Sequence, residues 1–113
     1  MNPLRVLLAA IFIAITVYTI FTISEHGWAL FPVFFGDIAE MHWPGQFNFD
    51  FMCFLILSGL WVSWRHHFSA AGLALGVVAV IGGALFLSAY LFIQSYKTNG
   101  NIHALLLGSQ RAA

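Results

Sequence analysis

The chain contains a run of 28 residues, from Ser69 to Tyr96, without a single charged side chain. Two shorter uncharged runs precede it: 19 residues at 6–24 and 14 residues at 51–64. A helix needs about 20 predominantly apolar residues to cross the hydrocarbon core of a bilayer. The run at 51–64 approaches this length when it is extended back to Phe47. The sequence therefore predicts an integral membrane protein.

Composition agrees with a membrane location and excludes some classes of function. Of 113 residues, 61% are hydrophobic and 7% are charged, whereas a typical soluble domain is about 25% charged. With zero formal net charge and four Lys and Arg, the chain cannot form the basic patch that nucleic-acid binding requires. Cys53 is the single cysteine, so it cannot form an internal disulfide and is expected to be a small buried hydrophobe.

The fold class predicted is an all-α membrane protein in one domain, residues 1–113. Transmembrane helices are expected at about 4–23, 47–64 and 70–96. The loop 24–46 mixes acidic and aromatic residues, which predicts a short helix lying in the membrane interface. The first apolar run could instead belong to a signal peptide, but it exceeds the roughly 7–15 residues of a signal-peptide core. We therefore interpret it as a retained span.

Orientation follows from the positions of the basic residues. Three straight crossings would put Arg5 and Arg65 on one side of the membrane and Lys97 and Arg111 on the other, which is nearly a tie under the positive-inside rule. His66 and His67 add to the amino-terminal side, and all four acids lie opposite. We expect a multi-pass protein of the bacterial inner membrane with a cytoplasmic amino terminus.

The long loop holds the residue types of a metal site. Asp37 and Glu40 are three residues apart and would share a helix face, with His42 close behind. Carboxylates and imidazoles bind divalent metals, but no His-Glu-x-x-His pattern is present. A solvated polar face is favoured over a metal or catalytic site.

Asp50 is the most interesting single residue, because it lies between two phenylalanines at the start of the second span. Ionisable groups within spans usually face protein or water and have a partner. Asn48 and Asp50 are predicted as buried polar residues, with Asp50 bonding the backbone at the helix start, Asn48 or a loop histidine. The role is either a structural anchor or a contact for a proton or ligand.

Small residues recur along the third span. Gly72, Gly76, Ala79 and Gly83 would lie on a shared face, and such faces let helix backbones approach closely. They predict a contact with another helix, from this chain or from a partner.

No cofactor and no catalytic residue is predicted. The five histidines fall at rims or in loops, whereas a haem in a helical bundle needs ligands inside facing helices. The sequence lacks a Gly-x-Ser-x-Gly motif, a P-loop and a dinucleotide fingerprint. An enzyme is therefore not favoured.

Several short motifs resemble small bacterial three-span membrane proteins classed as a domain of unknown function. They are Glu25-His26-Gly27, Phe34-Phe35, Asp50 at the start of an apolar helix, and Trp64-Arg65-His66 at a hairpin. The resemblance covers about residues 10–95 and implies the fold and a bacterial membrane location, with no activity. The chain departs from it at His26, where an amide is common, and at its Trp43-Pro44-Gly45-Gln46 turn.

Three readings of function remain open. The favoured one is an accessory or interaction subunit of a larger membrane complex, whose partners are the bilayer and other subunits, or a second copy bound through the third span. The second is a binder of a lipid-like ligand, such as a quinone, carotenoid or fatty chain, in an apolar slot at Phe34, Phe35 and Trp43. The third is a small oligomeric enzyme or transporter that uses the acidic loop.

Overall fold

The computed structural model describes residues 1–112, which form helices and short connections without a strand. Three helices are long and apolar enough to span a membrane, as in a multi-pass membrane protein: α1 (Asn2–His26), α3 (Trp43–Arg65) and α4 (Ala70–Lys97). The predicted all-α class with three such helices is confirmed. The shorter helices are α2 (Leu30–Glu40), α5 (Ile102–Leu107) and α6 (Ser109–Ala112).

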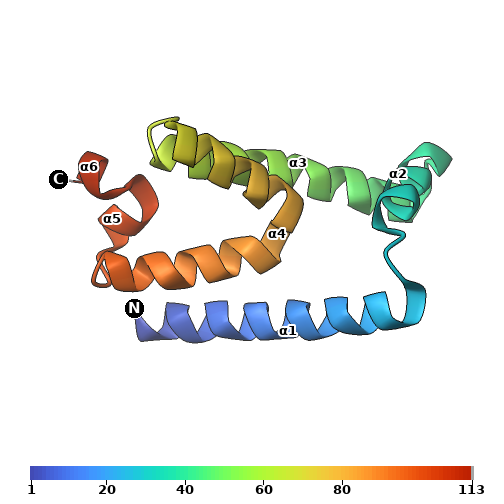
Figure 1. Ribbon diagram of the computed structural model, residues 1–113, viewed down its shortest axis with the longest axis horizontal. Helices are drawn as coiled ribbons and strands as arrows, with labels where there is room; N and C mark the ends of the chain where they lie inside the picture. The colour runs from blue at the N-terminus through green and yellow to red at the C-terminus, as the bar shows by residue number, and fades with distance from the viewer. Residues whose placement is uncertain (113) are drawn as a thin grey trace.

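Helix α4 bends sharply at Gly83, and its second half returns toward the end at which the helix began (Figure 1). Gly83 has φ 57° and ψ −139°, a conformation that glycine adopts far more readily than any residue with a Cβ. A straight helix of 28 residues would be roughly 42 Å long. Instead, Arg65 before α4 donates a hydrogen bond to the carbonyl of Leu105 after it, at 2.7 Å.

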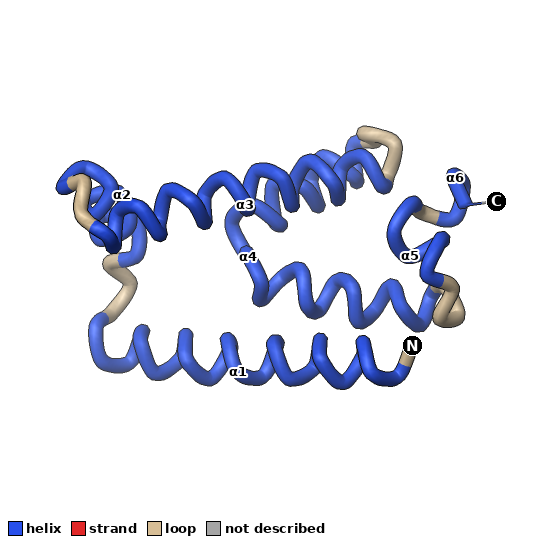
Figure 2. The backbone as a smooth tube through the Cα atoms, turned by 180° about the vertical axis from the view of Figure 1, so that it is seen from behind, coloured by secondary structure: helices blue, strands red, loops and turns tan. Residues whose placement is uncertain are grey.

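The reversal overturns one prediction about topology. Lys97 and Arg111 were expected on the side opposite Arg5 and Arg65, and this is wrong. Arg5 donates to the hydroxyl and carbonyl oxygens of Ser95, and Arg111 donates to the carbonyl of Trp64. Both chain ends therefore lie at the same end of the molecule (Figure 2). Each half of α4 is about 13 residues, or roughly 20 Å, so neither half alone covers a core of about 30 Å.

The first half of α4 packs against the second half of α3 at close backbone distance. A Cβ at Gly76 would lie 2.9 Å from the carbonyl oxygen of Gly59, and one at Gly59 would lie 2.8 Å from that of Gly76. The Ser63 hydroxyl donates to the carbonyl of Gly72 at 3.2 Å. Such close packing is a main force that joins membrane helices.

The core sits between these two helices and the returning half of α4. Val62 and Ala79 are fully buried, and Tyr90 packs with them. Helix α1 lies along the second half of α4 and buries one residue, Leu8. Helix α2 crosses the start of α3, where a Cβ at Gly45 would lie 2.9 Å from the Cα of Ile38. Most buried residues therefore lie at the end that bears the termini, and close packing at the other end is confined to the crossing of α2 and α3.

Candidate functional site

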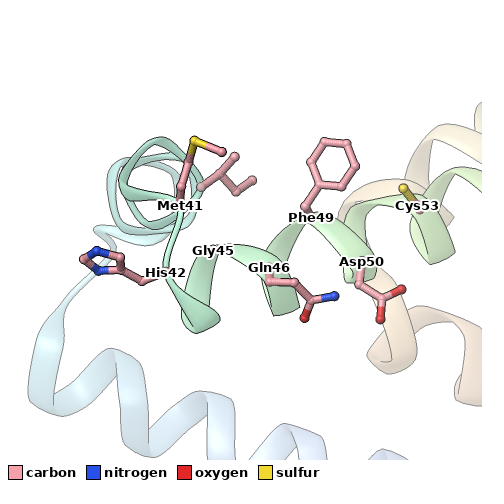
Figure 3. Close-up of a pocket in the computed structure, with 8 residues that line it drawn as sticks. Met41, His42, Gly45, Gln46, Phe49, Asp50 and Cys53 are labelled. Carbon is pink, nitrogen blue, oxygen red and sulfur yellow. The ribbon is translucent and has the colours of Figure 1, made fainter.

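An open groove of about 820 Å³ runs along α2 and the first half of α3. Its α3 residues recur every three or four positions, so they share one helix face. The groove is lined by Ile38, Met41, His42, Gly45, Gln46, Phe49, Asp50 and Cys53. Cys53 is exposed, so the expectation of a buried cysteine is wrong. Figure 3 shows Met41 and Phe49 along one edge and Gln46 and Asp50 along the other. The groove thus has an apolar wall and a polar wall, and it is open to the surroundings along its length.

The polar wall differs from its prediction. Asp50 is exposed, and within residues 1–112 its carboxylate accepts no hydrogen bond. Asn48 is half-buried and donates to the carbonyl of Phe34 at 3.2 Å, which ties α3 to α2. Two residues along a helix correspond to a rotation of about 200°, so the two side chains lie on opposite faces. Asn48 is the structural anchor, and Asp50 has no hydrogen-bond partner among residues 1–112.

Asp50 lies well inside an apolar helix. It is seven residues after Trp43, where α3 begins, which corresponds to about 10 Å along the axis. Gln46 is one turn earlier on the same face and is also exposed. An ionised carboxyl is an acceptor only, whereas the amide both donates and accepts. The pair is therefore suited to a ligand or side chain that carries a cation or several donors.

The apolar slot predicted at Phe34, Phe35 and Trp43 does not line the groove. Phe34 packs edge-on against its neighbour Phe35, with ring centroids 5.1 Å apart. Trp43 packs against Phe47 at 6.1 Å. The apolar wall comes instead from Ile38, Met41 and Phe49, which belong to two different helices and are brought together only by the packing of α2 on α3.

The candidate metal residues Asp37, Glu40 and His42 are not brought together. Among residues 1–112, no group of three His, Cys, Asp or Glu side chains could hold a metal ion. Met41 ends α2 in the left-handed conformation, with φ 60°, and His42 follows in an extended one. This break turns His42 away from the helix face that carries the two acids.

The small face of α4 is occupied within the chain. Gly72, Gly76, Ala79 and Gly83 are all buried. Gly76 lies against Ser63 and Gly59 of α3, and Gly83 lies near Phe51, 3.1 Å from the position of an added Cβ. The helix that these residues contact is α3 of the same chain, so this face is not free for self-association.

A second polar cluster, which sequence reasoning missed, surrounds Arg65. Its side chain is 5% exposed and donates to the carbonyls of Leu105 and Ala104 and to the hydroxyl of Tyr90, at 2.7, 3.2 and 3.0 Å. The two carbonyls belong to the last turn of α5, where a cation is favourable. Arg65 thereby ties the carboxyl-terminal segment to the α3–α4 turn.

His66 completes this cluster. Its Nε2 lies 2.5 Å from the Tyr90 oxygen. Because Arg65 already donates to that oxygen, the phenol proton is available for an unprotonated Nε2. Burial, together with the nearby positive charge of Arg65, lowers the pKa of His66. A neutral ring is thus the form that fits this site.

Comparison with protein-family models, with curated proteins and with solved structures gives no match. The resemblance to small bacterial three-span proteins therefore stays a prediction.

Proposed function

We propose that the protein is an accessory subunit that binds a helix of another membrane protein along the α2–α3 groove. The observation that carries the proposal is the exposed carboxylate of Asp50, which has no hydrogen-bond donor within residues 1–112. Ionisable groups in spans are costly and almost always face a partner or water. A partner helix with a Lys, Arg, His or amide side chain would supply the missing donor.

The sparse packing around the groove supports the same proposal. Exposed apolar residues continue from the groove onto neighbouring surfaces of α2 and α3, including Phe35, Phe47 and Phe54. Packing and interhelical hydrogen bonds drive helix association in lipid, where a hydrophobic force is absent. A helix in this groove would gain both, through the apolar wall and through Gln46 and Asp50.

We further propose that the end bearing both termini faces the cytoplasm of a bacterial inner membrane. All four Lys and Arg lie in or beside elements at this end, whereas the four acids belong to the end of α1, to α2 and to the first half of α3. That asymmetry is the pattern of the positive-inside rule. In a Cys53→Ser background, Asn101→Cys should be labelled from the cytoplasm and Glu40→Cys from outside. Labelling of both from one side would contradict this topology.

The accessory role is tested by crosslinking and co-purification from native membranes. A photo-crosslinking residue at Gln46 should capture one membrane protein in stoichiometric yield, at a segment with a cationic or amide side chain. Asp50→Leu should abolish its co-purification, and Asp50→Asn should weaken it. Glu40→Gln is the matched control, because it removes an exposed acid of α2 outside the groove lining.

The folding of the Asp50 variants must be checked separately. Asp50 makes no contact that the isolated chain needs, so Asp50→Asn should change the free energy of unfolding by no more than about 0.5 kcal/mol. Unchanged co-purification with Asp50→Leu would show that the groove is not the interface.

A lipid-like ligand is the alternative occupant, favoured by the volume of the groove and its apolar wall. In that case a quinone, carotenoid or fatty chain should be retained in one-to-one yield on purification. Met41→Ala and Phe49→Ala should then release it, with no protein crosslinked at position 46.

A further inference from the structure

We propose that the basic end of the molecule binds the headgroup of an anionic phospholipid. The basic end is defined by Arg5, Arg65, Lys97 and Arg111. This inference is independent of the groove, because it concerns the opposite end of the molecule.

The positive charges of the basic end are not neutralised within the described chain. The hydrogen bonds of Arg65 and Arg111 go to carbonyl and phenol oxygens. Those of Arg5 go to Ser95 and to the side-chain carbonyl of Asn2. Among residues 1–112, none of these arginines donates to a carboxylate. Among residues 1–112, the cations of this end therefore have no acidic side chain as a partner.

Aromatic rings place two of these cations at the level of lipid headgroups. The Arg5 guanidinium lies 3.9 Å from the centroid of the Tyr96 ring, and that of Arg111 lies 4.0 Å from the Trp64 ring. Tyr and Trp concentrate at membrane–water interfaces. Both guanidinium groups are half-buried rather than enclosed, so donors remain free to meet a phosphate.

The cations are also gathered around neighbouring residues at this end. Arg5 bonds to Ser95, two residues before the exposed Lys97. Arg111 contacts Trp64, next to Arg65. The positive charges of Arg65 and Lys97 both contribute to lowering the pKa of His66. Basic sites between helices on the cytoplasmic side are the known form of anionic-headgroup recognition.

The structure favours a lipid over a free anion, because Leu106 and Tyr96 are exposed apolar or aromatic residues beside the cations and would contact acyl chains. A lipid with a net negative headgroup is required, since the choline cation of phosphatidylcholine would lie among like charges. Phosphatidylglycerol is the probe that meets this requirement.

The test is a titration of the purified protein in neutral detergent with phosphatidylglycerol or phosphatidylcholine, followed by native mass spectrometry. We expect phosphatidylglycerol to bind about tenfold more tightly, with the preference weakened by salt. Lys97→Gln should weaken its binding roughly fivefold, the value of one cation near a membrane surface. The exposed side chain of Lys97 makes no hydrogen bond within residues 1–112, so this variant should fold.

Glu25→Gln is the matched control. It changes the net charge by one unit at the other end of the molecule, and phosphatidylglycerol affinity should stay unchanged. Equal affinity for both lipids, or no effect of Lys97→Gln, would overturn the proposal. Inorganic phosphate at matched ionic strength should not displace the lipid, and displacement would overturn the assignment to a phospholipid.

Discussion

At the basic end the guanidinium of Arg65 is buried and its donors meet two backbone carbonyls and a phenol. At the groove end the carboxylate of Asp50 is exposed and meets nothing within residues 1–112. Both are charged groups beside apolar helices, where an unpaired charge is costly. The first is satisfied by the fold itself and serves stability. The second has no hydrogen-bond donor among residues 1–112, and this difference is the basis on which we propose a binding role for the groove.

The same contrast holds for glycine. Gly76 lets two helix backbones touch, so an added Cβ would meet α3, whereas Gly36 in α2 has nothing within 4 Å of an added Cβ. The close packing beside Gly76 and the open space beside Gly36 predict that a larger side chain alters folding at the first position and is tolerated at the second.

The largest expected effect is that of Gly76→Leu. Its side chain would collide with Gly59 and Ser63, and overpacking costs about 1–3 kcal/mol or more. The temperature of thermal unfolding in detergent should fall strongly, and most of the protein should fail to fold. Gly36→Leu, the matched change at the open end, should be tolerated. Equal effects of the two variants would remove the contrast between the ends.

Arg65→Leu should have the next largest effect. It leaves the carbonyl of Leu105 without its donor, at about 1–3 kcal/mol for a buried unsatisfied group, whereas that of Ala104 keeps the N–H of Gly108. Proteolysis should then cut the segment after Lys97 much faster than in the wild type. Lys97→Gln also removes one positive charge but no side-chain hydrogen bond, so it should leave the cleavage rate unchanged.

Gly83→Ala tests whether the bend in α4 contributes to the stability of the fold. A residue with a Cβ at φ 57° and ψ −139° costs about 1–3 kcal/mol, and the Cβ would lie 3.1 Å from the Phe51 ring. A stability loss in this range is expected from chemical denaturation. Unchanged stability, with Asn101→Cys labelled from the opposite side, would mean that α4 crosses the membrane as a straight helix.

A smaller effect is expected from pH. Because the pKa of His66 is lowered in the folded state, the unfolded chain binds the proton more readily. Stability from this group is therefore full above about pH 6.5 and is lost as the pH falls through the folded-state pKa. His66→Gln should flatten this part of the profile of unfolding temperature against pH. A profile that His66→Gln leaves unaltered would show that the pKa of His66 is not lowered in the folded protein.

The sequence by itself determined the helices. In a chain with 7% charged residues, the long uncharged runs have no alternative to the helix, because a backbone in lipid must satisfy its own hydrogen bonds. The helix in the first connection could be predicted from its apolar residues. The small face of α4 could be predicted from the spacing of Gly72, Gly76 and Ala79.

Only the tertiary structure decided the direction of α4 and the grouping of charges. A glycine in an apolar run is compatible with close packing or with a bend. Gly83 alone therefore did not predict that α4 reverses its direction. Without the bend at Gly83, Arg65 and Leu105, which are 40 residues apart in the sequence, would not come into contact. The exposure of Asp50 likewise depends on which face of α3 receives α2. Local pattern fixes a helix, whereas long-range packing fixes which of its faces remains open.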